Sequence, residues 1–261
     1  MSILWDWKSS RHTLDYRQTI VIPDPPPEPE PEPETLTLVL DVPSYTEVAS
    51  GDMLMALIST DANPTVTSPN GWAAEDQIGG TAKSYIDIRI SDGSEPENYT
   101  WNFDGAEDAV GAILWLKRVH ATEYVDAKVI TSGTGSTVTV PSITTTVRKD
   151  LLVTLVSMND GVLIDTATLP RKFTTLWTVA TSGQAIGSVG SNAGYEVIKK
   201  AGEVASFNFD TVDDVSTDYY IIRIAIAPLG SDPVPGPADD AILLETDDFL
   251  LLETDDYILL E

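Results

Sequence analysis

Histidine is scarce in this chain and cysteine is absent, which limits the chemistry that the sequence can support. The 261 residues include two histidines, His12 and His120, and no cysteine. Neither histidine has a serine or metal-binding partner at a spacing typical of a catalytic triad or a zinc site. Glycine-rich phosphate-binding motifs and the HExxH motif are also missing from the sequence. We therefore predict no catalytic residue, no metal site and no cofactor, and we expect that the protein is not an enzyme.

Carboxylates are the one reactive group present in excess. The chain has 41 Asp and Glu against 15 Lys and Arg, and its formal net charge is −26. The composition does not exclude a pair of carboxylates that catalyses glycoside hydrolysis. With so many acidic residues, however, most of them must lie on the solvated surface. No DxDxDG calcium loop occurs. A cation could relieve repulsion between the Asp pairs at 247–248 and 255–256. We favour the alternative, in which these Asp side chains turn outward into solvent. The negative charge argues against binding to nucleic acid.

Tryptophan offers a second kind of binding chemistry, because its ring can stack on a sugar. The candidate glycan platforms are Trp72, Trp101 and Trp177. The alternative for each is packing in a hydrophobic core, and this alternative is favoured for Trp115 inside the apolar run AILWLKRV. No stretch approaches the ~20 apolar residues of a membrane span, and the first residues lack the unbroken apolar run of a signal peptide.

Two segments precede the globular part of the chain. Residues 1–23 carry three basic and two acidic residues, against 12 and 39 in the remainder. Aromatic and cationic side chains together are typical of a peptide that docks on another protein, although the arm could instead fold back on its own body. Residues 24–34 alternate Pro and Glu and predict a polyproline II spacer; recognition by a proline-binding domain is the alternative. The candidate anchor residues are Ile3, Leu4, Trp5, Trp7, Arg11, Tyr16 and Arg17.

Residues 35–229 contain an internal duplication. The segment VPS at 42–44 matches VPS at 140–142, and Asp52 matches Asp150 at the same offset of 98 residues. PNGW at 69–72 has a weaker counterpart in PRKF at 170–173, where we expect the turn not to be kept, and NFD recurs at 102–104 and 208–210. The landmarks keep their order while the offset grows, which indicates loop insertions. We therefore predict two related domains, at 35–128 and 129–229.

The sequence pattern within each copy is that of short strands. TLTLVLDV, YIDIRI, STVTV, LLVTLVSM and IIRIAIA alternate with period two or are continuously apolar, and turn-forming clusters separate them. No segment has a convincing helical period. The predicted fold class is all-β: two tandem antiparallel β-sandwich domains, jelly-roll or immunoglobulin-like, with an extended amino-terminal arm and a carboxy-terminal β-repeat.

A second breaker-rich linker at 230–240 leads to a tail at 241–261 with a period of eight: AILLETDD, FLLLETDD and YILLE. A strand of such a repeat would be apolar on both faces, and exposed apolar strands aggregate. We therefore predict self-association of the tails, with a homotrimer favoured; packing of the tail on its own chain is the alternative. The predicted oligomerisation residues are Ile242, Leu243, Leu244, Phe249, Leu250, Leu251, Leu252, Tyr257, Ile258, Leu259 and Leu260.

The tail resembles the short LLLE-type carboxy-terminal repeats of tailed-bacteriophage virion proteins, particularly fibres and appendages. The stretch GDMLMALISTDANPTVTSPNGW is similar to β-sandwich modules of phage and bacterial surface proteins. The resemblance implies a structural protein of the virion surface, made in the host cytoplasm, whose arm binds a capsid, portal or tail subunit and whose domains project outward toward the host surface. The alternative is a carbohydrate-binding or adhesin module that binds a host glycan.

Overall fold

The computed structural model describes residues 35–105, 108–120, 122–181, 188–229 and 258–259, all within one compact unit, Pro33–Glu261. The described residues form several antiparallel sheets and no α-helix, so the predicted all-β class is confirmed. The arm at 1–23, the linkers at 24–34 and 230–240, and all of the tail except residues 258 and 259 lie outside the described residues.

The first half of the described chain forms two sheets. The strands are β1 (Thr35–Asp41), β2 (Met53–Asp61), β3 (Thr65–Thr67), β4 (Ala73–Gly79), β5 (Ala82–Ile90), β6 (Asn98–Asp104) and β7 (Ala109–Leu116). A three-stranded sheet has the order β1-β6-β3. The first large sheet has the order β17-β7-β2-β5-β4, where β17 (Ile258–Leu259) comes from the carboxy-terminal tail.

The second half forms three sheets. The strands are β8 (Val125–Gly135), β9 (Thr137–Val140), β10 (Ile143–Thr145), β11 (Asp150–Asn159), β12 (Thr174–Ala180), β13 (Val189–Ile198), β14 (Gly202–Val204), β15 (Phe207–Asp210) and β16 (Thr217–Ile226). Two 3₁₀ turns, η1 (Thr166–Thr168) and η2 (Val212–Asp214), interrupt them. The second large sheet has the order β12-β13-β11-β16-β8, and the pairs β10-β14 and β15-β9 form two small sheets.

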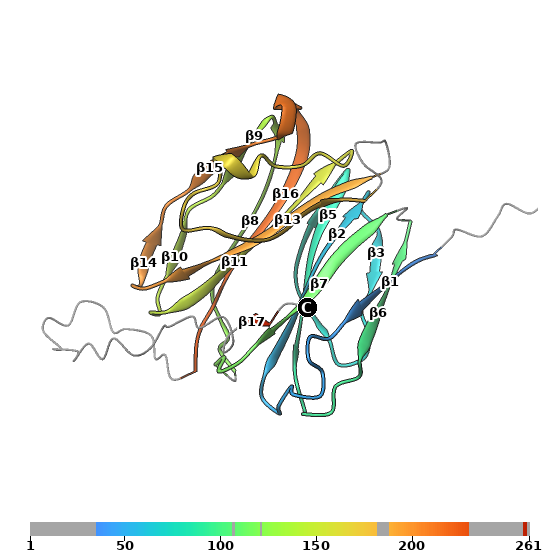
Figure 1. Ribbon diagram of the computed structural model, residues 1–261, viewed down its shortest axis with the longest axis vertical. Helices are drawn as coiled ribbons and strands as arrows, with labels where there is room; N and C mark the ends of the chain where they lie inside the picture. Colours follow the sequence, from blue (N-terminus) through green and yellow to red (C-terminus); the bar gives the residue numbers. More distant parts are fainter. Residues whose placement is uncertain (1–34, 106–107, 121, 182–187, 230–257, 260–261) are drawn as a thin grey trace, which may run out of the picture. The chain divides into compact units, whose positions relative to one another are not determined.

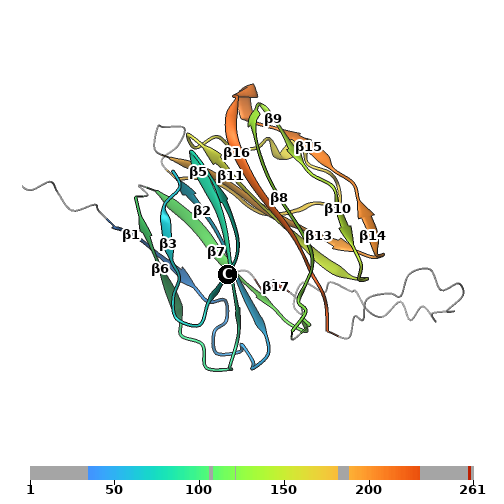
Figure 2. The same ribbon diagram turned by 180° about the vertical axis from the view of Figure 1, so that it is seen from behind.

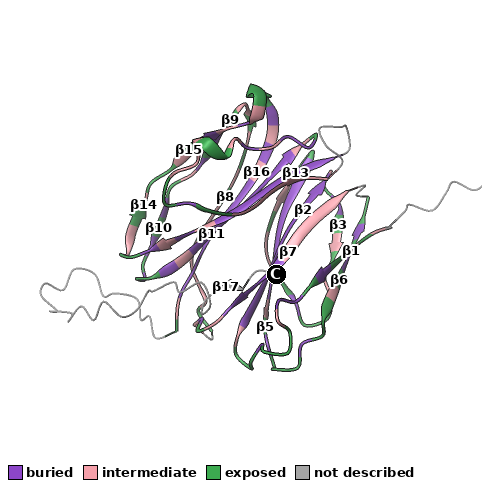
Figure 3. Ribbon diagram, viewed as in Figure 1, coloured by how far each residue is buried: buried purple, intermediate pink, exposed green. Residues whose placement is uncertain are grey.

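The central strands are buried on both faces, which explains their continuous apolar sequences. All nine residues of β2 are buried. Met53 and Met55 belong to one hydrophobic core and Leu54 and Ala56 to another, because successive side chains of a strand point to opposite faces. Figure 3 shows the same burial along β2, β11, β13 and β16.

The sheets are stacked in layers (Figures 1 and 2). The core that Met53 and Met55 share with Val153, Leu155 and Ile222 joins the two large sheets face to face. Separate cores lie between the first large sheet and the three-stranded sheet, and between the second large sheet and the two small sheets. Each large sheet is therefore covered on both sides, as the apolar runs of its central strands require.

The two large sheets have matching strand orders. Position by position, β7-β2-β5-β4 corresponds to β16-β11-β13-β12, and the central strands β2 and β11 are those that the offset of 98 residues aligns. The PRKF prediction was wrong: the backbone N–H of Phe173 donates to the carbonyl of Pro170 at 2.9 Å, as the N–H of Trp72 does to Pro69 at 3.2 Å. The predicted boundary at 128/129 falls inside β8, and the division into two domains stays a prediction.

Candidate functional site

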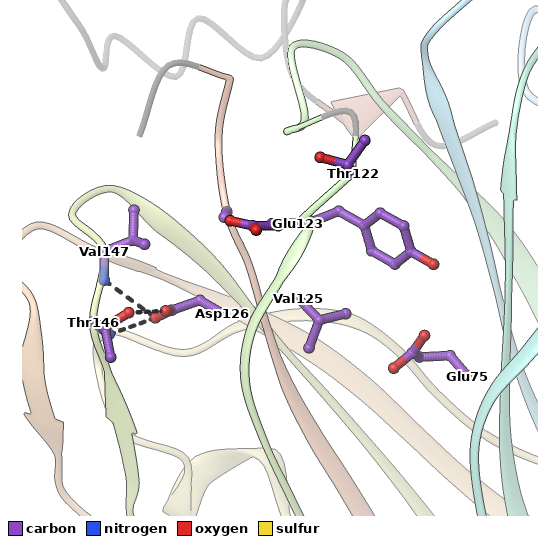
Figure 4. A pocket seen from close by; sticks show the side chains of 9 residues that line it. Glu75, Thr122, Glu123, Val125, Asp126, Thr146 and Val147 are labelled. Atoms are coloured by element: carbon purple, nitrogen blue, oxygen red, sulfur yellow. Dashed lines mark hydrogen bonds between the residues drawn. The ribbon is translucent and has the colours of Figure 1, made fainter. Parts of the chain in front are cut away.

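A hollow of about 460 Å³ lies beside the start of β8. Strand β4 contributes Glu75 to its wall, β8 contributes Val125 and Asp126, and neighbouring loops supply the other residues. Figure 4 shows Glu75 and Asp126 on opposite sides of the hollow with Val125 between them. The lining residues are Glu75, Thr122, Glu123, Tyr124, Val125, Asp126, Thr146, Val147 and Ala227.

Asp126 is held as a carboxylate by hydrogen bonds from the loop before β11. Its Oδ2 accepts from the backbone N–H groups of Thr146 at 2.6 Å and Val147 at 3.2 Å, and its Oδ1 accepts from the Thr146 hydroxyl. Burial works toward a higher pKa of Asp126, but the hydrogen bonds from Thr146, Asp150 and Val147 outweigh burial and lower it. Asp126 therefore carries its charge at neutral pH.

Asp150 lies behind Asp126 and is fully buried. Burial, together with a hydrogen bond to Asp126 and its charge, raises the pKa of Asp150 to about 8. As a carboxylate, Asp150 would have no donor for either oxygen among the described residues. Asp150 is therefore protonated at neutral pH and donates to Asp126, which is how two neighbouring carboxyl groups avoid mutual repulsion.

The opposite wall of the hollow is closed by an ion pair. Lys128 Nζ lies 3.1 Å from Glu75 Oε1 and 2.9 Å from Asp76 Oδ2. The hydrogen bond to Asp76 and then that to Glu75 raise the pKa of Lys128 against the effect of partial burial. Lys128 comes from β8 and the two acids from β4, so the pair joins the two large sheets at their edges.

The acids at and behind the hollow are engaged in contacts within the protein. Asp150 has a shifted pKa but no surface open to a ligand. The oxygens of Asp126 accept from N–H groups and a hydroxyl of the loop before β11. Asp52 Oδ2 likewise accepts within the protein, from Ala49 N and Trp115 Nε1, both at 2.9 Å. The described residues contain no group of three or more His, Cys, Asp or Glu side chains able to hold a metal ion.

The structure places His120 in a loop between the large sheets. Its backbone N–H donates to the carbonyl of Ala227 at 3.0 Å, and its Nδ1 accepts from the N–H of Glu123 at 2.9 Å. Both contacts fix the position of His120 between β7 and β8. His12, the other histidine, lies outside the described residues.

The three candidate glycan platforms lie in or against hydrophobic cores. Trp101 is fully buried and its indole N–H donates to Asp87 Oδ2 at 2.7 Å, while Trp72 is 8% exposed and packs edge-on against Trp101. Neither ring has a face open to a sugar. Trp177 is partly buried, packs against the core between the large sheets and donates to Ser191 Oγ at 3.0 Å. For Trp72 and Trp101, the structure therefore agrees with the alternative given in the sequence analysis, which is packing in a hydrophobic core.

The predicted anchor residues and most of the predicted oligomerisation residues lie outside the described chain. The anchor residues all belong to 1–23, and the tail is described only at Ile258 and Leu259. There the backbone pairs with β7 of the same chain, Ile258 opposite Leu116 and Leu259 opposite Trp115. Association between copies stays a prediction.

Four buried serines between the two large sheets are absent from the sequence predictions. Their hydroxyls form a chain: Ser191 to Ser59 at 2.9 Å, Ser59 to Ser157 at 2.6 Å, and Ser157 to Ser84 at 2.7 Å. Ser59 and Ser157 lie 98 residues apart, the same offset as between the two VPS segments. The sequence indicates two of these serines, because a single serine interrupts the apolar residues of LISTD and of LVSMND.

No protein-family model matches the chain, and no curated protein or solved structure does so either. Among the described residues, no helix has the length and apolar character needed to cross a membrane.

Proposed function

We propose that this protein is a structural component of a bacteriophage particle, a head or tail appendage. In this proposal the arm at 1–23 attaches the chain to a capsid, portal or tail subunit, and the acidic β body projects outward and contacts the host surface. The observation that supports it is the construction of the described body. The indole of Trp101, the carboxyl of Asp87 and the buried serines hold sheets together, and two strongly apolar or aromatic segments flank the body.

We infer further that the body is a tandem duplication of one β-sandwich. The matching orders β7-β2-β5-β4 and β16-β11-β13-β12 support this inference. In the first half, the neighbours β2-β5-β4 correspond to strands B-E-D of immunoglobulin domains, and the neighbours β3-β6 correspond to strands C-F. The first and last strands are exchanged between the sheets relative to that fold, since β1 pairs with β6 and β7 with β2.

The tail supplies self-association in this proposal. Full burial of one Leu side chain contributes roughly 1.5–3 kcal/mol, so apolar repeats gain most when sister chains cover them. We propose a trimer. Its mass in solution, measured by light scattering, should fall to that of a monomer when residues 239–261 are removed.

The attachment role is tested by deleting residues 1–23. The shortened protein should still form trimers but should no longer cofractionate with particles, because the arm alone provides the anchor. Unchanged incorporation into particles would contradict the proposal. Binding of the intact protein to host glycans without any association with particles would favour the adhesin alternative.

A further inference from the structure

The outer edge of β7 is largely unpaired among the described residues. On its inner side β7 pairs with β2 over eight positions, from Thr60↔Ala109 to Met53↔Leu116. On its outer side it pairs only with the two residues of β17. The corresponding edge of the second large sheet is different, because β16 pairs with β8 over ten positions.

The duplication explains why β8 has no counterpart. At the offset of 98 residues, β8 corresponds to residues 27–37, and these include prolines at 27, 29, 31 and 33. Proline has no backbone N–H and cannot donate to a ladder, so this segment is unsuited to pair with β7. An edge left without a partner offers its N–H and C=O groups to any suitable strand.

We propose that the third repeat of the carboxy-terminal tail, residues 257–261, is the missing fifth strand and adds to the β7 edge of its own chain. The antiparallel pairs Ile258↔Leu116 and Leu259↔Trp115 set its register. A longer ladder in this register runs along β7 toward Ala109.

The composition of the repeat fits this edge. Leu116 belongs to the core between the two large sheets, and Trp115 to the core on the other face of the first large sheet. Side chains opposite each other in a ladder share a face, so a strand added here needs apolar residues on both faces. YILLE provides them, and this is the property that made the tail unsuited to an ordinary surface strand.

The exit point of the chain favours its own tail over that of a neighbour. Leu229, the last described residue of the body, donates its N–H to the carbonyl of Arg118 at 2.5 Å, two residues beyond the end of β7. Pro228 also forms a bridge with Val119. The tail therefore starts beside its acceptor, and the segment 230–257 is long enough to return, which gives the intramolecular strand a high effective concentration.

The inference deepens the proposed function and rests on its account of the tail as a β-repeat. It assigns the third repeat to the body and leaves residues 241–245 and 249–253 to contact other copies. The two proposals can fail separately, because one concerns a strand within a chain and the other the mass of the assembly.

The test is disulfide trapping in a chain that has no cysteine of its own. Leu116→Cys combined with Ile258→Cys joins residues that face each other across the ladder, at a separation that a disulfide spans. We expect a bond within one chain, seen as faster migration on a non-reducing gel at monomer mass. Leu250→Cys and Ile242→Cys, the same position in the second and first repeats, are the matched partners for Leu116→Cys and should form the bond at least tenfold less. A bond between two chains, equal trapping of all three repeats, or no bond would overturn the proposal.

Hydrogen exchange gives a second readout that does not depend on cysteine. Leu259→Pro removes a ladder donor from the third repeat, and Leu251→Pro makes the same change in the second. We expect L259P to lower protection of amides in β7 about tenfold while β2 is unaffected, and L251P to leave both unchanged. Equal protection of β7 in the two variants would overturn the proposal, whereas the oligomeric mass reports on the proposed function alone.

Discussion

Asp52 and Asp150, which the sequence offset of 98 residues aligns, have two different environments. Asp52 accepts from Ala49 N and from the indole of Trp115. In the second half Ala225 pairs with Leu152 at the position where Trp115 pairs with Leu54, so no indole donor is available there. The loop N–H of Val147 bonds to Asp126 instead. Asp150 is left buried against another carboxyl group and keeps its proton.

The pKa of Asp150, raised to about 8, makes folding depend on pH. The folded state binds a proton that the unfolded state, with an ordinary Asp pKa near 4, has lost. The stability from this group is therefore complete below about pH 4 and is lost as pH rises toward 8. Asp150→Asn cannot titrate, so its stability relative to wild type should rise by about 4 kcal/mol between pH 5 and pH 9.

Urea unfolding of wild type and D150N at pH 5, 7 and 9 measures this difference. Glu203→Gln is the control, because Glu203 is exposed on β14 and its change should give the same pH profile as wild type. Parallel profiles for wild type and D150N would show that Asp150 is ionised in the folded protein.

Gly190 is required by a close backbone approach. A Cβ at this position of β13 would lie 1.8 Å from the carbonyl oxygen of Val162. Gly190→Ala must move one strand or the loop, and we expect a loss of about 3 kcal/mol or more. Gly135→Ala is the control, since its Cβ would meet nothing closer than 3.5 Å. Thermal unfolding of the two variants should show a large decrease in Tm for G190A only.

At the level of elements, a buried ion pair joins β13 to β16, and its arginine also bonds to the connection between β9 and β10. Arg223 Nη2 on β16 lies 3.0 Å from Glu196 Oε1 on β13, and Arg223 Nη1 donates to the carbonyl of Pro141 at 2.6 Å. Arg223 is fully buried, and burial lowers its pKa in spite of the charge of Glu196. The positive charge of the buried Arg223 is therefore stabilised by the negative charge of Glu196.

Removing one partner of this pair should be costly. Glu196→Ala leaves a buried guanidinium without its counter-charge, and we expect a loss of about 3–5 kcal/mol. Arg223→Met together with Glu196→Ala should recover part of that loss, because the buried charge is then removed as well. Glu203→Ala, at an exposed position of β14, should stay within about 0.5 kcal/mol. Chemical denaturation of the three variants distinguishes a buried charge from a general effect of losing an acid.

Strands were easier to predict from sequence than turns or edges. LLVTLVSM lies within β11, and all of IIRIAIA except its last residue lies within β16, because the inner position of these strands requires apolar side chains on both faces. The turn at 170–173 was missed because Arg171 and Lys172 carry no local turn signal, although the aromatic Phe173 is buried as Trp72 is. The pairing of β17 with β7 depends on which edge is open, and this follows only from the complete sheet.

At the scale of the whole molecule, the chain of four serines lies where the two halves meet. Ser59 and Ser157, which lie 98 residues apart on the matching strands β2 and β11, bond to each other, and each also bonds to one further serine, Ser191 or Ser84. The two halves therefore meet through equivalent residues, as two copies do across a twofold axis.

This symmetry predicts matched mutational effects. Ser59→Ala and Ser157→Ala should each cost about 1–3 kcal/mol, because each leaves buried hydroxyls without a partner. The double variant should cost less than the sum, since each serine is the partner that the other loses. Ser50→Ala, at an exposed position, is the control. A double-mutant cycle from urea denaturation gives the coupling, and strict additivity would contradict this account.

The sequence predicts two similar halves but not the way in which they meet. The order of the landmarks from Val42 to Asp210 predicts two similar sets of strands. Apolar residues on both faces of β2 show that something covers each face, and they do not show that β11 and its neighbours are the cover. Similarly, no local pattern could bring Asp126 and Asp150 together, because they come from strands that are not neighbours in the sheet.

The attachment of β1 has a mechanical consequence. In the described chain β1 is an edge strand with β6 as its one ladder neighbour, over seven pairs, whereas β16 near the other end is held by both β11 and β8. If tension is applied between Thr35 and Leu229, β1 should peel away first and the large sheets should yield later. In a single-molecule pulling experiment, this order appears as a short extension at low force before the main rupture.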